Sequence, residues 1–166
     1  MYTCSIQVLA SKNKNKMNKK VAIFPGSFDP FHKGHKYVVD TALNMFDEVY
    51  VCIGCNPSKK TLFPVENRQI FIEKAFENNP RVKVIHTSGL IVDKAKEIGA
   101  TCIVKGARNA NDFNDEVMQS DANLKIGNIP TVIIPTPNTL SYISSTLIRT
   151  LINANGDKTV VQDMLC

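Results

Sequence analysis

Residues 21–35, with the sequence VAIFPGSFDPFHKGH, contain the pattern that decides the fold. The run Val21–Phe24 is short and apolar, which is typical of a buried strand. It is followed by a loop that contains Gly and Pro, and then by Lys33–Phe46, where apolar side chains recur at the spacing of one helix face. We therefore expect a strand, a loop and a helix in this order.

The same alternation continues along the chain. Further strands are predicted at Glu48–Gly54, Arg81–His86, Thr101–Val104 and Thr131–Ile134. Further helices are predicted at Arg68–Glu77, with a start at Pro64, and at Gly89–Ile98, Asp112–Ile126, Ser144–Asn153 and Asp157–Leu165. Five short strands separated by helices indicate an α/β protein with a Rossmann-like, doubly wound, five-stranded parallel sheet. Ligands of such sheets bind outside the carboxyl ends of the strands, so the loops that follow the strands are the candidates for function.

The composition fits one globular domain, which we place at residues 18–166. Hydrophobic residues make up 43% and charged residues 21% of the 166 residues, so neither a disordered chain nor a disulfide scaffold is indicated. The sequence contains no apolar stretch long enough to span a bilayer and no signal-peptide pattern. We therefore expect a cytoplasmic protein that makes no membrane contact.

The net charge of +5 is compatible with binding to nucleic acid or with a pocket for polyanionic small molecules. Five of the 20 Lys and Arg residues precede the first strand: Lys12, Lys14, Lys16, Lys19 and Lys20. We expect residues 1–17 to be a disordered leader, and without its charge the body of the chain is near neutral. We therefore expect no nucleic-acid partner.

The five cysteines have no regular spacing, which favours reduced thiols over a disulfide framework. Cys52 and Cys55 form a CxxC pattern, but they fall in and just after a predicted strand. A redox pair places its first cysteine at a helix N-terminus, and a zinc site needs further ligands. We therefore expect these two side chains to pack in the core.

The loop after the first strand carries groups that suit a phosphate ligand. Gly26 lets the backbone approach a ligand closely, and Ser27 offers a hydroxyl group. His32 and His35 are three residues apart at a helix start, so both side chains lie on one face, and Gly34 leaves room between them. The helix N-terminus itself attracts anions. We therefore expect a polyphosphate clamp.

Two other interpretations of the histidines stay open at this point. His32 and His35 could form half of a metal site, but the remaining histidine, His86, follows a different strand, and a zinc site would need third and fourth ligands. One of the histidines could instead cap the helix. Residues beyond this loop decide between these interpretations.

Two motifs place the chain near a known superfamily. Residues 26–35, GSFDPFHKGH, resemble the HxGH signature of the nucleotidylyltransferase superfamily, and residues 143–149, ISSTLIR, resemble its C-terminal motif. Between them lie residues 56–60, NPSKK, followed by Phe63 and by ENR at residues 66–68. Residues 105–108, KGAR, follow the fourth strand and precede Asp112, Phe113 and Glu116. This intervening pattern resembles the phosphopantetheine adenylyltransferase family, and the resemblance extends from about Lys20 to Asp157.

The resemblance implies an adenylyl transfer in which the phosphate of 4′-phosphopantetheine attacks the α-phosphorus of ATP, giving dephospho-coenzyme A and pyrophosphate. The attacking group is already an anion, so catalysis consists mainly of positioning and charge stabilisation. The resemblance assigns catalytic roles to His35, which stabilises the transition state, and to Lys59 and Ser27.

The resemblance also implies the ligands of each substrate. The residues implied for ATP are Ser27, Phe28, His35, Gly106, Ala107, Arg108, Glu116, Leu140, Ser141, Tyr142, Ile143, Ser144, Ser145 and Thr146. The residues implied for the acceptor are Ser27, Lys59, Ile91 and Lys105. Mg²⁺ is expected on the phosphates, without ligands from protein side chains. The family also implies a homo-oligomer, commonly a hexamer.

The sequence departs from the family pattern at three places. The family has Arg-Gly-Leu-Arg where this chain has KGAR at residues 105–108, so Lys105 keeps a charge but lacks the bidentate fork of arginine. The family has Met-Asn where this chain has Ala122 and Asn123, and family members continue somewhat beyond the position of Cys166. The alternatives to be tested are another acceptor in the same superfamily, a basic nucleic-acid-binding module, and a flavodoxin-like binding protein without catalysis.

Overall fold

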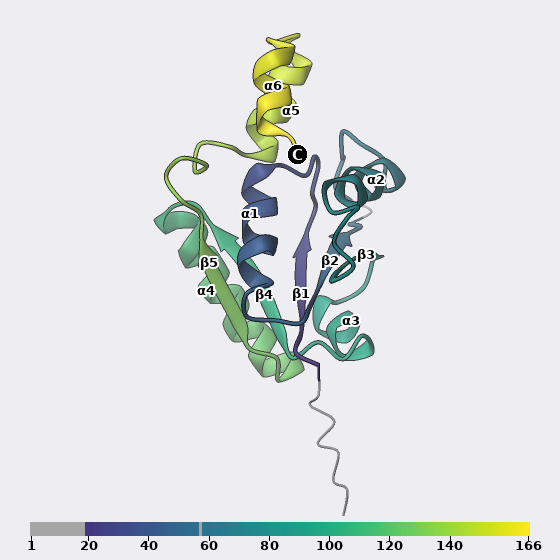
Figure 1. Ribbon diagram of the computed structural model, residues 1–166. Helices are drawn as coiled ribbons and strands as arrows, with labels where there is room; N and C mark the ends of the chain where they lie inside the picture. The colour runs from purple at the N-terminus through teal and green to yellow at the C-terminus, as the bar shows by residue number, and fades with distance from the viewer. Residues whose placement is uncertain (1–18, 57) are drawn as a thin grey trace, which may run out of the picture.

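The computed structural model describes residues 19–56 and 58–166, and its centre is a five-stranded sheet (Figure 1). The strands are β1 (Val21–Gly26), β2 (Glu48–Gly54), β3 (Val82–Thr87), β4 (Cys102–Ala107) and β5 (Thr131–Pro135). All neighbouring strands are parallel and follow the order β3-β2-β1-β4-β5. The first strand, β1, lies at the centre of the sheet, and the later strands are added outward on both sides of it. This confirms the predicted doubly wound α/β fold in a single domain.

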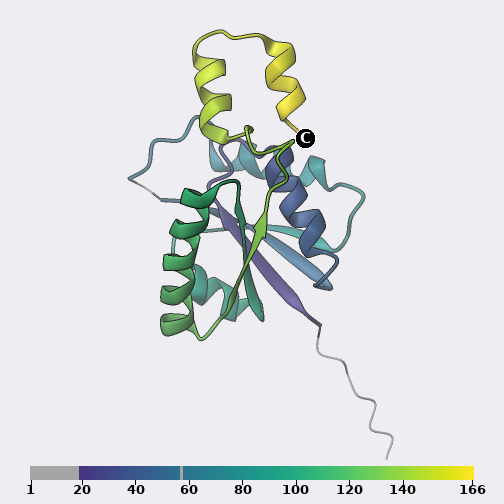
Figure 2. The same cartoon turned by 90° about the vertical axis from the view of Figure 1, so that its left-hand side faces the viewer.

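Helices cover both faces of the sheet. They are α1 (Lys33–Ala42), α2 (Val65–Ala75), α3 (Ile91–Glu97), α4 (Ala110–Gly127), α5 (Ser145–Asn153) and α6 (Lys158–Met164). Helices α1 and α2 pack on one face through the cluster around Phe24, and α3 packs on the other face beside Ile103 and Ile129. Helices α5 and α6 form a pair beyond the carboxyl ends of the strands (Figures 1 and 2).

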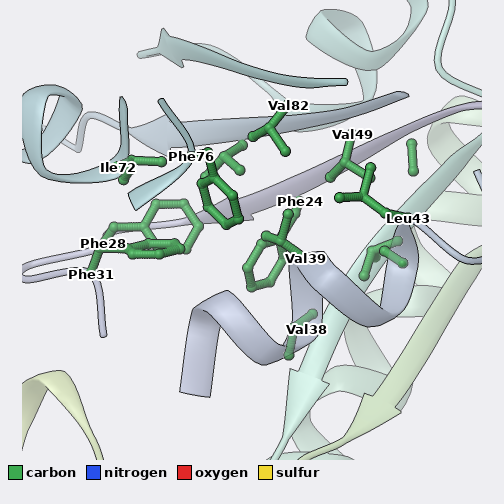
Figure 3. Packing of buried hydrophobic residues seen from close by; sticks show 14 of the residues in the cluster. Phe24, Phe28, Phe31, Val38, Val39, Leu43, Val49, Ile72, Phe76 and Val82 are labelled. Atoms are coloured by element: carbon green, nitrogen blue, oxygen red, sulfur yellow. The ribbon is translucent and has the colours of Figure 1, made fainter. Parts of the chain in front are cut away.

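The larger hydrophobic cluster lies directly beneath the loop that follows β1 (Figure 3). Phe24 of β1 contacts Phe28 of the loop with the ring centroids 5.2 Å apart, and Phe28 contacts Phe31 at 5.5 Å. Phe31 in turn packs edge-on against Phe76, which follows α2. This aromatic chain fixes the loop to the core, so the polar groups of the loop are held by apolar packing on their inner side.

The main elements were predicted correctly, but several boundaries differ. Strands β1 and β4 run two to three residues beyond the predicted ends, because Pro25 and Gly26 pair with β2 and residues 105–107 pair with β5. Lys105, Gly106 and Ala107 therefore belong to a strand and not to a loop. Helix α1 ends at Ala42 and not at Phe46, because the N–H groups of Asn44 and Met45 donate to the carbonyls three residues before them, those of Thr41 and Ala42, in a tighter turn.

The cysteines behave as the sequence indicates. Cys52, Cys55, Cys102 and Cys166 are free thiols, and Cys52 is fully buried in β2. Burial raises the pKa of the Cys52 thiol to about 11, which is the opposite of a reactive cysteine. The predicted leader, residues 1–17, and Cys4 within it lie outside the described residues. Within the described ranges, none of the helices has the length and apolar character that a membrane span requires.

Candidate active site

Two adjoining pockets open at the carboxyl ends of the strands. The first, which we call the His35 pocket, has a volume of about 450 Å³ and lies between the β1–α1 loop, the end of β4, and helices α4 and α5. The second, which we call the Ile91 pocket, has a volume of about 570 Å³ and lies between the loops after β1, β2 and β3 and the helix α4. The residues that line both pockets are Pro25, Gly26, Ser27, Lys59, Lys105 and Gln119. Both volumes are in the range of small-molecule sites.

Phe28 gives the β1–α1 loop its shape. Its φ is 49°, an uncommon left-handed conformation for a bulky residue, and its side chain is only 2% exposed. A Cβ atom on Gly26 would lie 2.7 Å from the Phe28 ring, so glycine is needed at position 26 for this ring to pack. The Phe28 side chain therefore belongs to the core, and the residue can contact a ligand in the His35 pocket through its backbone.

The two histidines of the loop form a capping box at the start of α1. Nδ1 of His32 accepts a hydrogen bond from the Gly34 N–H at 3.1 Å, and Nδ1 of His35 accepts one from the His32 N–H at 3.3 Å. Their rings are stacked with the centroids 3.7 Å apart. In a neutral imidazole whose Nδ1 accepts, Nε2 carries the proton. The cap therefore fixes His35 as an Nε2–H donor, so capping and a role in the pocket are compatible.

The surroundings keep both histidines neutral. Burial, together with the nearby positive charge of Arg108, lowers the pKa of His32 to about 4. Burial also lowers the pKa of His35 well below its usual value, and His32 and Arg108 add to this effect. At neutral pH the His35 pocket therefore holds a neutral hydrogen-bond donor beside a permanent cation.

Ser27 and Lys59 meet where the two pockets join. Nζ of Lys59 donates a hydrogen bond to Oγ of Ser27 at 3.1 Å. The loop that carries Lys59 is tied to the β1–α1 loop by the buried Asp29, whose carboxylate accepts from the N–H groups of Leu62 and Phe63 at 2.8 and 2.9 Å. The sequence motif around Asp29 thus positions a lysine about thirty residues further along the chain.

Helix α4 supplies carboxylates to two cations at the end of β4, Lys105 in the strand and Arg108 just after it. Nζ of Lys105 lies 3.0 Å from Oε2 of Glu116, in a largely buried ion pair that lacks hydrogen-bond geometry. Nε of Arg108 donates to Asp112 at 2.8 Å. Both cations would have to exchange a carboxylate for a phosphate in order to bind the ligands that the sequence predicts for them.

The N-terminus of α5 closes one side of the His35 pocket. Ser144 is the N-cap, and its Oγ accepts from the Leu147 N–H at 3.0 Å. Oγ of Ser145 donates to the Pro30 carbonyl at 2.9 Å, which fixes the helix end to the β1–α1 loop. The backbone N–H groups of a first helical turn have no partner within the helix. Those of Ser145 and Thr146 are therefore suited to an anion.

Most of the predicted ligands lie together. The His35 pocket gathers Ser27, Phe28, His35, Gly106, Arg108, Glu116, Ser144, Ser145 and Thr146, and the Ile91 pocket gathers Ser27, Lys59, Ile91 and Lys105. Gly106 also has a packing role, because a Cβ atom there would lie 2.7 Å from Cγ2 of Val38 in α1.

Five predicted ATP ligands do not line either pocket: Ala107, Leu140, Ser141, Tyr142 and Ile143. Ala107 is buried in β4. Ile143 is buried with Ile148 and Met164, with Leu140 packed against this group, and Tyr142 is 55% exposed. Their contacts with a nucleotide remain predictions from the family resemblance.

Four further residues line the Ile91 pocket and were not predicted to have a role there: Thr87, Ser88, Gln119 and Asn123. The missed signal was periodicity, because Asp112, Glu116, Gln119 and Asn123 are spaced four, three and four residues apart. This spacing places polar side chains along one face of a helix. The sequence could therefore have been used to predict that α4 presents a polar face to the strand ends.

Metal ligands are sparse in the part of the chain that the structure describes. No three His, Cys, Asp or Glu side chains converge there as a candidate metal site. The His35 pocket does contain the carboxylates of Asp112, Asp115 and Glu116. Asp112 and Glu116 are occupied by Arg108 and Lys105, so this donor set fits a metal ion that arrives with substrate phosphates better than one held by the protein alone.

A parallel doubly wound sheet with a loop that carries two histidines, and with a helix N-terminus, at the strand ends defines a nucleotidyltransferase domain. Residues 23–151 match the cytidylyltransferase-like family. The phosphopantetheine adenylyltransferase of Porphyromonas gingivalis is 43% identical over 141 residues, which cover 85% of this chain and 92% of the relative. That of Phocaeicola vulgatus is 46% identical over 138 residues, which cover 83% and 91%. The chain therefore belongs to the phosphopantetheine adenylyltransferase family.

Solved structures share the fold at low sequence identity. The nicotinic acid mononucleotide adenylyltransferase of Plasmodium falciparum, complexed with NaAD, has a TM-score of 0.62 and 18% identity, and covers 89% of this chain and 90% of its own. A bifunctional NMN adenylyltransferase/ADP ribose pyrophosphatase from Francisella tularensis, complexed with AMP and a Mn ion, has a TM-score of 0.64 and 17% identity. The match covers 89% of this chain and 44% of the Francisella chain. These likenesses establish the architecture of the sheet and its helices.

Proposed function

We propose that this chain transfers the AMP part of ATP to the phosphate of 4′-phosphopantetheine, giving dephospho-coenzyme A and pyrophosphate. The observation that carries the proposal is the junction of the two pockets at Ser27, Lys59 and Lys105. A transfer between two substrates requires both to reach one point, and here the polar groups of that point line both pockets. The relatives support adenylyl transfer in coenzyme A biosynthesis as the activity of the family.

In this proposal the His35 pocket receives the triphosphate of ATP. Nε2 of His35 donates to the α-phosphate, where negative charge increases in the transition state. Arg108 leaves Asp112 to pair with the phosphates, and the first turn of α5 binds the β- and γ-phosphates through its N–H groups. Glu116 accepts from the ribose hydroxyls once Lys105 has turned to the acceptor.

The Ile91 pocket receives the acceptor. Its phosphate lies between Lys59 and Lys105 with Ser27 beside it, and the pantetheine arm runs toward Ile91 past the polar side chains of Thr87 and Asn123. A pocket of both polar and apolar lining suits an arm that contains amide groups and methylene groups. The oxygen of the acceptor phosphate attacks the α-phosphorus, the bond to the β-phosphate oxygen breaks, and pyrophosphate leaves. No proton has to be removed from the attacking oxygen, which explains why a neutral His35 suffices.

Enzymes of this family use a divalent metal ion, and we propose Mg²⁺ for this chain. When bound, the ion neutralises charge on the phosphates of ATP. Of the carboxylates that line the His35 pocket, Asp115 forms none of the ion pairs found among the described residues. We further propose a cytoplasmic homo-oligomer, a hexamer as is common in the family.

The test is pyrophosphate release from ATP and Mg²⁺ with a panel of acceptors. We expect release with 4′-phosphopantetheine and dephospho-coenzyme A as the second product. A higher kcat/KM with nicotinate mononucleotide, or with CTP and glycerol 3-phosphate, would assign the chain to another reaction of the superfamily. ATP binding without pyrophosphate release from any acceptor would support a binding protein without catalysis.

A further inference from the structure

Arg68 is a buried cation next to the proposed acceptor site, and neither the sequence motifs nor the proposed mechanism uses its charge. It lies in the first turn of α2 and is only 4% exposed. Nη1 of its guanidinium donates to the backbone carbonyl of Ser27 at 2.6 Å. Its Nε is buried and has no hydrogen-bond partner.

The charge of Arg68 has no counter-ion among the residues that the structure describes. None of the six ion pairs formed among residues 19–56 and 58–166 includes it. A buried charge is costly when it is unpaired, and a cation in the first turn also opposes the helix dipole of α2. A hydrogen bond to one carbonyl does not require a charged donor. The buried charge of Arg68 therefore lowers the stability of the folded chain, and the fold alone does not explain why a charged residue lies there.

The cavity beside Arg68 shows which ligand could use the charge. It has a volume of about 260 Å³, and Arg68 lines it together with Ser27, Lys59 and Ser88. These last three residues also line the Ile91 pocket, so the cavity is a side branch of the proposed acceptor site. The acceptor phosphate, which carries up to two negative charges, is the anion that the proposed reaction brings to this point.

We propose that Arg68 is a positioning residue for the acceptor phosphate. Its hydrogen bond holds the backbone of Ser27, whose hydroxyl contacts Lys59, and its charge favours the phosphate dianion at the junction of the pockets. Arg68 thus acts through Ser27 and through the electrostatic potential, in a region where burial limits screening by solvent. This inference rests on the proposed function, because it takes the ligand of the Ile91 pocket to be a phosphorylated acceptor.

The experiment compares Arg68→Met with Arg68→Lys and with a matched control, Arg81→Met. Arg81 also donates from Nη1 to a backbone carbonyl, that of Leu43 at 3.0 Å, but it lies away from both pockets. Three constants are measured for each variant: KM for phosphopantetheine, KM for ATP, and Ki for pantetheine, which is the same acceptor without its phosphate. Thermal unfolding is followed in parallel.

For Arg68→Met we expect KM for phosphopantetheine to rise about tenfold or more, while KM for ATP and Ki for pantetheine change less than about twofold. Arg68→Lys keeps the charge and loses the fixed fork, so we expect KM within about threefold of the original and a lower kcat. Arg81→Met should leave all three constants unchanged. A purely structural role would move Ki for pantetheine as much as KM for phosphopantetheine.

Two results would overturn the inference. One is an Arg68→Met variant that weakens pantetheine and phosphopantetheine equally or weakens neither. The other, which decides the matter if Arg68→Met does not fold, is a tenfold rise in KM for phosphopantetheine in the folded Arg68→Lys variant, where the charge is kept. If the unmodified protein released no pyrophosphate with phosphopantetheine, the proposed function would fail, whereas an active protein with an unaffected Arg68→Met variant would refute the role of Arg68 alone.

Discussion

His35 combines an observed structural contact with a chemical role that we propose. Its Nδ1 completes the cap of α1, which leaves Nε2–H as the donor in the pocket. We predict that His35→Ala lowers kcat by about 10²–10³ and changes KM for ATP much less, because a donor used mainly in the transition state has effects of this size. His32→Thr should lower kcat less than His35→Ala does, since threonine can also accept from the Gly34 N–H as an N-cap. Steady-state kinetics with ATP varied is the measurement, and a change confined to KM would make His35 a ground-state ligand.

Lys105 is the clearest departure from the family, and the structure adds a partner for it. Its ion pair with Glu116 links the proposed acceptor side to the proposed ribose side. We predict that Lys105→Arg changes kcat/KM by less than about tenfold, since the charge is kept. Lys105→Ala should raise KM for phosphopantetheine sharply and leave KM for ATP nearly unchanged.

The measurement is kinetics with each substrate varied in turn, and Lys60→Ala is the control, because Lys60 is exposed and lines neither pocket. A rise in KM for ATP alone in Lys105→Ala would place Lys105 in the nucleotide site and reverse the proposed division of roles. A rise in KM for both substrates would show that leaving Glu116 without its cation matters as much as losing the charge of Lys105.

At the scale of elements, sequence periodicity was enough for the type and order of strands and helices, because each buries an apolar face. It was not enough for their ends. Residues 105–107 were predicted to form a loop because Lys105 and Gly106 interrupt the apolar pattern, yet pairing with β5 extends the strand through Ala107. Strand pairing depends on residues far apart in the sequence, so a local pattern cannot supply it.

The candidate site shows the same limit, because a local sequence pattern does not reveal contacts between distant residues. The histidines and serines were predicted because each stands in a compact motif, and their capping roles follow from local geometry. Arg68 was quoted within such a motif but without a role, because its burial and its contact with Ser27 span 41 residues of sequence. The ion pair between Lys105 and Glu116 was missed for a related reason, since the two were assigned to different substrates and only the fold brings the strand end against α4.

For the molecule as a whole, the winding of the sheet explains why one site uses residues from 27 to 146. The first strand, β1, is the central strand, so the loop with Ser27 lies between the loops of both halves of the sheet. The half with β2 and β3 supplies Lys59 and Ile91, and the half with β4 and β5 supplies Arg108 and α5. The nucleotide side of the proposed reaction thus draws on the β1–α1 loop and the half with β4 and β5. The acceptor side draws on both halves, because Lys105 of β4 and Asn123 of α4 also line the Ile91 pocket, and transfer takes place at the topological switch point.

The buried histidines make the stability of the whole molecule depend on pH. Burial lowers the pKa of His32 to about 4 from an unfolded value near 6.5, so the unfolded chain binds more protons as the pH falls through this window. The stabilisation is complete above about pH 7 and is lost progressively toward pH 4. His32 alone should reduce the free energy of unfolding by about 2 kcal/mol between pH 7 and pH 5, and His35 should add to this loss in the same direction. Carboxylates contribute little until the pH falls further.

Denaturant unfolding of the unliganded chain at pH 7, 6 and 5 measures this effect. His32→Thr supplies the control, because threonine is also an N-cap residue but does not titrate. We expect the variant to lose less stability than the original chain over this interval, by about the contribution of His32. The variant should still show the part of the stability loss that is due to His35. Equal losses in the two proteins would mean that His32 is not held neutral in the folded state, and its Nδ1 would then not be the acceptor of the Gly34 N–H in the cap of α1.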